Sequence, residues 1–311
     1  TKYHYNVNDG GVWFTQNAGS SWVQRSDGLG ATEIYTAASS NLRKDIISIG
    51  TQDNGELYRD TTGWKTNRGG DWSKKMSYDF KNPVMVYYSD GTRRNVVGGG
   101  SPALSLPFTG DYNAIAFSRE MPDYCWVAKN DTLYFTRNVN ATPPIWSKIA
   151  DFTGNGIIDI HSSYADTNLF FSINRNGKLY VSNNILAATP NFISYNTPAT
   201  TNTAAALTSI RKKDSVLYIS CGNRIYRSNN YGASFTNISL NYPTINVKEL
   251  YHDLYTTDEL VIALNSDGVW YHTDTMSQWK SILKNLPTNC GLNDLSVYNI
   301  GSPSSVFRNS Y

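Results

Sequence analysis

Two stretches share one eight-residue pattern that decides the fold: Thr15-Gln16-Asn17-Ala18-Gly19-Ser20-Ser21-Trp22 and Ser228-Asn229-Asn230-Tyr231-Gly232-Ala233-Ser234-Phe235. Both octamers read hydroxyl, any residue, Asn, any residue, Gly, any residue, Ser, aromatic. An Asn side chain can bond backbone groups two residues further on, Gly allows a positive φ angle, and hydroxyl groups can cap the remaining amides. Each octamer therefore predicts a self-bonded turn between two strands, closed by an aromatic side chain that packs into the core.

A second repeat is a hairpin turn that carries Asn, Asp or Gly and leads into an apolar-aromatic strand. Its seven copies are Asn8-Asp9-Gly10-Gly11-Val12-Trp13, Asp53-Asn54-Gly55-Glu56-Leu57-Tyr58, Ser89-Asp90-Gly91, Asn130-Asp131-Thr132-Leu133-Tyr134, Arg175-Asn176-Gly177-Lys178-Leu179-Tyr180, Gly222-Asn223-Arg224-Ile225-Tyr226 and Ser266-Asp267-Gly268-Val269-Trp270. The copies are 36 to 46 residues apart, which is the period of a four-stranded propeller blade. No window shows the apolar stripe of an amphipathic helix.

The repeats predict an all-β fold, a seven-bladed β-propeller of four-stranded antiparallel blades. Six blades are expected at residues 31–71, 72–108, 109–153, 154–199, 200–245 and 246–289. The seventh is split between residues 290–311 and 1–30, because the N-terminus enters at a second strand and residues 292–298 form an unpartnered first strand. Pairing these ends would close the ring and remove the exposed sheet edges, which makes residues 1–311 a single domain.

The composition narrows the function classes. Only 17% of the 311 residues are charged and the net charge is +2, so we expect no nucleic-acid partner. No apolar run approaches the ~20 residues of a membrane-spanning helix. The 22 Tyr and 8 Trp residues, with Asn, Ser and Thr crowded in the turns, suit a secreted or cell-surface β protein. The start at Thr1 in mid-pattern suggests a module of a larger chain or complex.

Cysteine and histidine residues predict no metal or redox site. Cys125, Cys221 and Cys290 show no C-x-x-C spacing, and the four histidines are scattered without metal-ligand spacing. The first two cysteines lie in apolar runs, where buried free thiols are expected, although one disulfide is left open. No cofactor is predicted. The acidic hairpins could bind Ca²⁺ through oxygen ligands, so calcium is the alternative.

The octamers resemble the Asp-box (BNR) of sialidase-like, sortilin-like and xyloglucanase-like β-propellers, with Asn where Asp is commoner. Gly50-Thr51-Gln52-Asp53-Asn54-Gly55, followed by Arg68-Gly69-Gly70-Asp71, is similar to propellers in large surface proteins of Bacteroidetes-type bacteria, and the similarity is best over residues 1–100. In that pattern another Gly tends to follow the Asp, whereas Trp72 follows Asp71 here. The resemblance implies an extracellular or cell-surface module that binds a glycan or a protein.

Candidate ligand-binding residues lie where a propeller presents its loops around the central channel. The loops between strands 2 and 3 and those between blades share one face, and acids and amides near aromatic rings there suit sugar or peptide ligands. The predicted ligand-binding residues are Asp9, Gln52, Asp53, Asn54, Arg68, Asp71, Asp90, Arg224 and Asp267. Asp-Gly and Asn-Gly are also what tight hairpins need, so each acid has a structural interpretation as well.

The favoured function is a non-catalytic binding or scaffold module, and the alternative is a glycoside hydrolase of xyloglucanase-like or sialidase-like type. Asp9 is similar to the catalytic Asp of xyloglucanases in its Asp-x-Gly-Gly surroundings, with Asp53 or Asp71 as its partner carboxylate. Those enzymes take one acid from each of two propellers, and this chain predicts one propeller. A sialidase would need three arginines around the substrate carboxylate, and no convincing triad can be assembled from Arg68, Arg119, Arg211 and Arg224.

Overall fold

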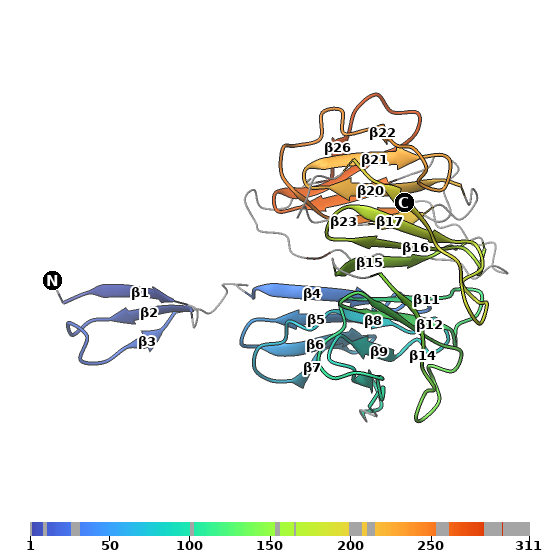
Figure 1. The fold of residues 1–311 in the computed structure, drawn as a ribbon. Helices are drawn as coiled ribbons and strands as arrows, with labels where there is room; N and C mark the ends of the chain where they lie inside the picture. The colour runs from blue at the N-terminus through green and yellow to red at the C-terminus, as the bar shows by residue number, and fades with distance from the viewer. Residues whose placement is uncertain are drawn as a thin grey trace. The chain divides into compact units, whose positions relative to one another are not determined.

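The computed structural model describes residues 2–8, 11–25, 32–99, 103–152, 156–164, 166–198, 207–209, 215–252, 261–282 and 294, and these residues contain strands and no helix. The chain forms two compact units, Thr1–Glu33 and Ile34–Tyr311. Each unit is described by itself (Figure 1).

The N-terminal unit is an antiparallel sheet in the order β1-β2-β3. Its strands are β1 (His4–Asn8), β2 (Gly11–Thr15) and β3 (Val23–Gln24). Three strands are what the sequence predicts for the N-terminal share of the split blade. Of the predicted first strand of that blade, residues 292–298, only Asp294 lies among the described residues. Closure of the ring and a single domain over residues 1–311 therefore stay predictions.

The second unit contains six antiparallel sheets, each built from consecutive strands. We number these sheets as blades 1 to 6 in chain order. Blade 1 has strands β4 (Ile34–Ser39), β5 (Ile47–Thr51), β6 (Gly55–Asp60) and β7 (Gly63–Arg68); blade 2 has β8 (Met76–Tyr78), β9 (Met85–Tyr88) and β10 (Arg93–Asn95); blade 3 has β11 (Ala114–Phe117), β12 (Cys125–Lys129), β13 (Thr132–Thr136) and β14 (Ser147–Asp151). Blade 4 has β15 (Ile157–Ser162), β16 (Phe170–Asn174), β17 (Lys178–Ser182) and β18 (Ile193–Asn196); blade 5 has β19 (Leu207–Ser209), β20 (Leu217–Cys221), β21 (Arg224–Ser228) and β22 (Thr236–Asn237); blade 6 has β23 (Val247–His252), β24 (Val261–Asn265), β25 (Gly268–His272) and β26 (Lys280–Ser281).

The seven sheets of the two units confirm the all-β propeller fold and match the predicted number of blades. Blade 2 departs from the prediction, because it has three strands among the described residues where four were expected. Thr92 and Ala103 form an isolated antiparallel bridge, so a single residue pair stands among the described residues where the fourth strand was expected.

Apolar side chains fill the seams between neighbouring blades of the second unit. In blade 3 the strand β12 is buried on both faces: Cys125 and Val127 belong to a cluster with Tyr87 of blade 2, while Trp126 packs with Phe170 of blade 4. Comparable clusters join blades 1 and 2, blades 4 and 5, and blades 5 and 6. The first strands of consecutive blades also contact one another, as β4 does β8 and β11 does β15. Each blade is therefore stabilised mainly by burial of apolar surface against its neighbours.

The two octamers form the predicted self-bonded turns, with the same bonds in both. In the second, the Ser228 hydroxyl accepts from the Asn230 and Gly232 amides at 3.2 and 2.8 Å. The Asn230 side chain accepts from the Ser234 amide and donates to the Ser234 hydroxyl, both at 2.9 Å. The corresponding bonds in the first octamer involve Thr15, Asn17, Gly19 and Ser21.

Degenerate copies of the octamer pattern run from Thr136 to Trp146, from Ser182 to Phe192 and from Thr273 to Trp279. The aromatic residues that end the octamers and these copies mostly enter the core, as predicted. Phe235 packs at the seam of blades 4 and 5, and Trp146, Phe192 and Trp279 pack in three further seams. Trp22 differs, since it is 40% exposed. The described residues of its unit form one three-stranded sheet, and they provide no second layer to bury the ring.

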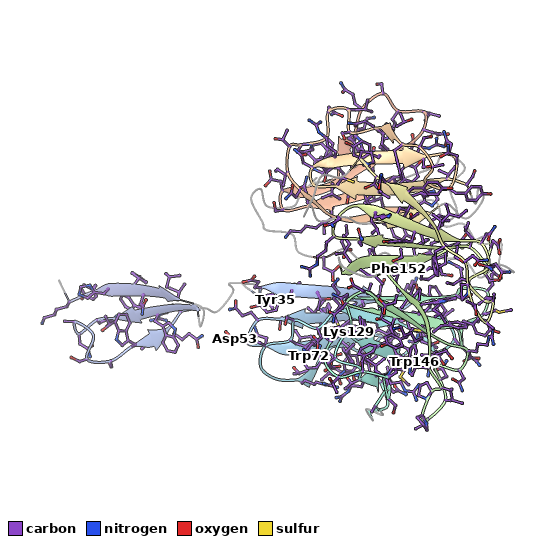
Figure 2. All side chains as sticks on the ribbon, in the orientation of Figure 1. Tyr35, Asp53, Trp72, Lys129, Trp146 and Phe152 are labelled. Atoms are coloured by element: carbon purple, nitrogen blue, oxygen red, sulfur yellow. The ribbon has the colours of Figure 1, made fainter. Side chains whose placement is uncertain are left out.

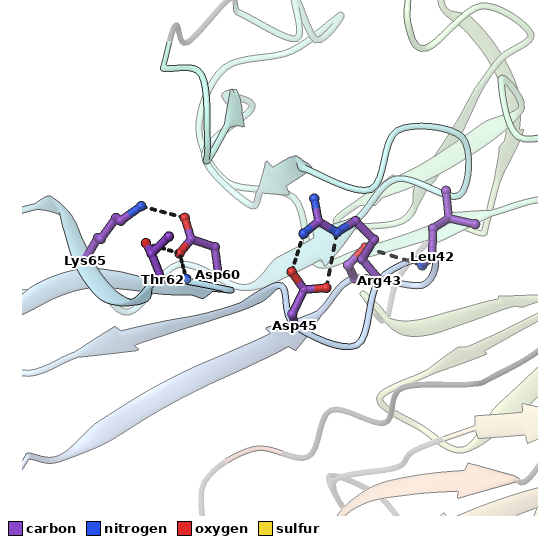
Figure 3. A network of polar contacts seen from close by, with 7 residues as sticks. Leu42, Arg43, Asp45, Asp60, Thr62 and Lys65 are labelled. Carbon is purple, nitrogen blue, oxygen red and sulfur yellow. Dashed lines mark hydrogen bonds and ion pairs between the residues drawn. The ribbon is translucent and has the colours of Figure 1, made fainter. Parts of the chain in front are cut away.

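Blade 1 replaces the octamer with the short hairpin Asp60-Thr61-Thr62-Gly63 (Figure 3). Asp60 Oδ1 accepts hydrogen bonds from the amide and the hydroxyl of Thr62 at 2.8 and 2.7 Å. Lys65 Nζ lies 2.6 Å from Asp60 Oδ2, and Arg43 and Asp45 form a second ion pair in the turn between β4 and β5. The Asp60 carboxylate thus accepts hydrogen bonds from its own turn, as the Asn side chain does in the octamer.

Candidate functional site

The hairpin between β5 and β6 positions three of the predicted site residues, Gln52, Asp53 and Asn54. Thr51 pairs with Gly55 at the end of the ladder. Asp53 and Gly55 have positive φ angles of 59° and 78°, a region that Asp tolerates and Gly adopts without cost. The Asn54 amide donates to the Gln52 carbonyl at 2.6 Å, which holds the turn tight.

The loop that leads from blade 1 to blade 2 lies directly against this hairpin. The Trp72 amide donates to the Thr51 carbonyl at 3.0 Å, and Asn54 and Gly70 form an isolated bridge. A Cβ atom on Gly55 would lie 1.7 Å from the Arg68 carbonyl oxygen, so this approach requires glycine. The two loops that the sequence places on the channel face are thus in contact here.

Asp53 and Asp71 meet in that contact. Asp71 Oδ1 accepts a hydrogen bond from the Asp53 backbone amide at 2.8 Å, and both residues are exposed. One carboxylate therefore caps the turn that carries the other. Figure 2 labels Asp53 with Trp72 and Tyr35, which lie at the same end of blade 1.

Arg68 is stacked rather than extended into solvent. Its guanidinium carbon lies 4.4 Å from the ring centre of Trp72 and 5.2 Å from that of Tyr88, within the range of cation–π attraction. Its Nε atom is 3.8 Å from Glu56 Oε2. The side chain is 24% exposed, so it presents one edge of a planar donor to the surface.

Glu56 is a site residue that sequence reasoning missed. Its side chain is fully buried at the seam of blades 1 and 2. Tyr88 donates to its Oε1, as does Asn67 at 3.3 Å. Burial raises the pKa of Glu56 above its ordinary value of 4.5, although these hydrogen bonds and the nearby Arg68 act in the opposite direction. The sequence contains one weak indication that Glu56 is special. Five other copies of the hairpin hold a residue that is not acidic at this position, namely Gly11, Thr132, Lys178, Arg224 and Gly268.

The remaining predicted residues lie on turns of other blades, and one lies outside the described residues. Asp90 accepts from the Thr92 amide and hydroxyl at 2.9 and 2.7 Å, which is a self-bonded turn. Arg224 is exposed at the start of β21. Asp267 is exposed in a turn, and its backbone amide donates to Asn265 Oδ1 at 2.9 Å. Asp9 lies outside the described residues. Among the described candidates, the structure thus brings Gln52, Asp53, Asn54, Arg68 and Asp71 together, and it places Asp90, Arg224 and Asp267 elsewhere.

A cavity of about 420 Å³ runs along the first strands of blades 1 and 2 in the second unit. Half-buried Tyr35, Ala37 and Ser39 of β4 alternate with buried Thr36 and Ala38. The lining residues are Tyr35, Thr36, Ala37, Ala38, Ser39, Asn41, Ser73, Lys75, Met76, Ser77, Tyr78, Glu249 and Asp294. Eight of the nine predicted ligand-binding residues are described, and none of the eight lines this cavity. We call it the channel cavity because first strands line the centre of a propeller.

Both charge signs and several hydroxyl groups line the channel cavity. Asp294 Oδ2 accepts from the Ala37 amide at 2.7 Å and from the Thr36 hydroxyl at 2.8 Å. Lys75 Nζ donates to the Asn113 carbonyl at 3.4 Å. Glu249 comes from β23 of blade 6. This set of donors and acceptors can satisfy a neutral polar ligand, such as sugar hydroxyls or a peptide backbone.

The described residues offer no ready metal site and no membrane span. No group of three or more His, Cys, Asp or Glu side chains among them is arranged to hold a metal ion. In the same residues no helix is long and apolar enough to cross a bilayer. The thiols of Cys125 and Cys221 are free and buried, and burial raises the pKa of both. Cys290 lies outside the described residues, and calcium binding stays an untested alternative.

Comparisons with known proteins agree with the fold. No family model matches the chain, and the curated proteins contain no match. A chain of the crystal structure of the mitotic checkpoint complex superposes with a TM-score of 0.63 at 9% identity, over 85% of this chain and 81% of that one. The GH74 enzyme of Niastella koreensis matches with a TM-score of 0.41 at 12% identity, over 93% of this chain and 55% of that one. The chain is thus similar to known structures in its β-propeller fold alone, and membership of the Asp-box group stays a prediction.

Proposed function

We propose that this propeller is a non-catalytic binding or scaffold module of an extracellular or cell-surface bacterial protein, and that it takes a glycan or a protein segment on its channel face. The observation that carries the proposal is the state of Asp53 and Asp71, either of which the sequence predicts as the catalytic partner of Asp9; Asp9 itself lies outside the described residues. Asp71 is bonded to the backbone of Asp53, whereas a glycosidase needs two carboxylates that face each other across an open cleft.

The channel cavity supports binding by its chemistry. Its hydroxyl, amide and ionic groups converge on a volume large enough for a sugar ring or for a short run of extended backbone. Asp294 is already engaged by two donors from β4, which favours a fixed polar wall over a carboxylate that exchanges protons with a substrate.

The placement outside the cell rests on the sequence. Turns rich in Asn, Ser and Thr, a 13% aromatic content and the resemblance to bacterial surface propellers all favour it. A match by fold to a chain of the mitotic checkpoint complex is compatible with a role in protein assembly.

A glycan array and a peptide array, each combined with a reducing-sugar assay, test the proposal. We expect binding without turnover, and about tenfold weaker binding in Glu249→Gln and in Lys75→Met. Asp274→Asn is the matched control, since this exposed acid in blade 6 does not line the cavity and is not a predicted ligand-binding residue. Hydrolysis of a polysaccharide that is lost in Asp53→Ala or Asp71→Ala would show that the module proposal is wrong and that the hydrolase alternative holds.

A further inference from the structure

The second octamer holds a tyrosine in a backbone conformation that tyrosine rarely adopts. Tyr231 has a φ of 58°, in the left-handed region where bulky side chains are genuine outliers. Its amide donates to the Ser215 carbonyl at 2.9 Å, and the octamer bonds described above fix the residues on either side. Ala18 has a φ of 54° at the same position of the first octamer, so the conformation belongs to the turn, and the second octamer carries a tyrosine there in spite of its conformational cost.

The turn that carries Tyr231 packs against blade 4. A Cβ atom on the adjacent Gly232 would lie 2.2 Å from Leu179 Cδ2, so the turn packs tightly on β17 through its glycine. Tyr231 itself is 43% exposed. The octamer thus presents this aromatic side chain at the surface, next to a glycine that is packed on β17.

Tyr231 completes a pocket of about 280 Å³ with six residues of blade 4, which we call the seam pocket. The pocket is lined by Asp166, Leu169, Val181, Asn183, Ile193, Tyr195 and Tyr231. Val181 pairs with Ile193, and Leu179 with Tyr195, so Val181, Ile193 and Tyr195 share one face of the sheet. That face continues into the apolar cluster between blades 4 and 5.

The seam pocket combines an apolar floor with a polar rim. Leu169 and Val181 are buried, and the two tyrosines, Asp166 and Asn183 add hydroxyl, carboxylate and amide groups. Asp166 Oδ1 accepts from the Asn168 amide at 2.8 Å, which orients the carboxylate. An aliphatic side chain in this pocket would cover the polar groups without bonding them, which is unfavourable. A ligand with one apolar face and a ring of hydroxyl groups suits both parts.

We propose that the seam pocket is a carbohydrate-binding site that takes a neutral pyranose ring, with Tyr231 and Tyr195 against its apolar faces and Asp166 and Asn183 on its hydroxyls. This site goes beyond the function proposed above, because the seam pocket shares no residue with the channel cavity. It also lies at the strand 3–strand 4 turn of blade 5, the end of a blade opposite to the strand 2–strand 3 turns.

The test uses the whole chain, with methyl β-D-glucopyranoside, methyl β-D-galactopyranoside and N-acetylglucosamine as probes in saturation-transfer NMR. The informative variant is Tyr231→Asn, because Asn accepts a positive φ better than Tyr does. We expect this variant to melt at the same or a higher temperature and to bind the responding sugar about tenfold more weakly. Tyr195→Ala should weaken binding in the same way.

Leu240→Asn is the matched control. Leu240 has a φ of 45° and is 55% exposed, so the substitution relieves the same kind of strain and leaves the seam pocket untouched. Sugar binding that persists in Tyr231→Asn, the absence of binding for all three sugars, or a response to n-butylamine in place of the sugars would each overturn the proposal. Glu249→Gln distinguishes the two sites: sugar binding that is unchanged in Tyr231→Asn and weakened in Glu249→Gln would belong to the channel cavity, whereas binding weakened only in Tyr231→Asn belongs to the seam pocket.

Discussion

Two carboxylates on the single strand β6 have opposite electrostatic environments. Glu56, at its start, is buried beside Tyr88 and Asn67, and burial raises its pKa. Asp60, at its end, bonds Lys65 and both donors of Thr62, and these bonds hold its pKa well below its ordinary value of 3.8. The two residues should therefore give the stability of blade 1 opposite dependences on pH.

For Glu56 the folded state binds its proton more tightly than the unfolded state does. Its contribution to the free energy of unfolding should fall as the pH rises from 4.5 through the raised pKa of the folded state. Thermal melts of the wild type and of Glu56→Gln between about pH 4 and about pH 8 test this, because Gln keeps the acceptor for Tyr88 and removes the titration. A constant difference in melting temperature across that range would contradict the prediction.

For Asp60 the sign is reversed. The stabilisation is present above pH 3.8 and is lost as the pH falls through the depressed pKa of the folded state. Asp60→Asn should have a lower urea midpoint than the wild type at about pH 7, and the gap should narrow below about pH 3. Lys65→Met is a second route to the same result, since it removes the partner of the carboxylate and keeps the Thr62 bonds. A gap that widens in acid would be incompatible with this account.

At the scale of the element, the octamer combines a hydrogen-bonded turn with a packing contact between blades. Comparison of the two octamers separates the energetic contribution of the turn from that of the contact. Gly19 and Gly232 occupy the same position, with φ angles of 94° and 89°. A Cβ atom on Gly19 has its nearest neighbour in the Trp22 ring at 3.9 Å, whereas one on Gly232 meets buried Leu179 at 2.2 Å.

Gly232→Ala should therefore cost more than Gly19→Ala. Both variants incur the strain of a positive φ, about 1–2 kcal/mol, and only Gly232→Ala adds the overpacking of a seam, about 1–3 kcal/mol. Hydrogen exchange at the Ser21 and Ser234 amides, which donate the corresponding hydrogen bond to the Asn side chain of each turn, compares the two costs directly. Equal losses of protection would mean that the contact with Leu179 contributes nothing.

The elements could be predicted from the sequence because their determinants are local. The octamer bonds and the hairpin turns depend on residues within four positions of each other, as the paired contacts of Asn17 and Asn230 show. Blade 2 was predicted less well, since its shorter hairpin repeat gave no sign that the described residues would form three strands and not four. The channel cavity could not be predicted in this way, because Glu249 and Tyr35 come together only after several blades have packed. Glu56 was missed for the same reason: its environment is made by Tyr88 of the next blade.

At the scale of the whole molecule, the contact of Asp294 with β4 bears on how the ring is completed. Residue 294 belongs to the segment predicted as the first strand of the last blade, and it bonds the first strand of blade 1 at Thr36 and Ala37. First strands of consecutive blades lie side by side elsewhere in the second unit. A contact with β4 is therefore what we expect of residue 294 if its segment forms the first strand of the last blade.

Asp294→Ala should loosen this contact without unfolding the other blades. The Ala37 amide loses its acceptor, so we expect its hydrogen exchange to become about tenfold faster, while amides of β12 in blade 3 stay protected. Asp267→Ala is the control for the loss of one negative charge. Unchanged exchange at Ala37 would show that the segment around residue 294 does not hold β4 in solution.

The octamer separates the positions that form the turn from the positions that vary, and this separation affects how such a protein can acquire new binding sites. The first, third, fifth and seventh residues make the bonds of the turn, while the second, fourth and sixth differ freely between the two copies, with Ala18 in one and Tyr231 in the other. A duplicated blade therefore inherits a ready scaffold together with a surface position that can change without cost to the turn's hydrogen bonds. New recognition could be acquired blade by blade, by exchange of one side chain at a time.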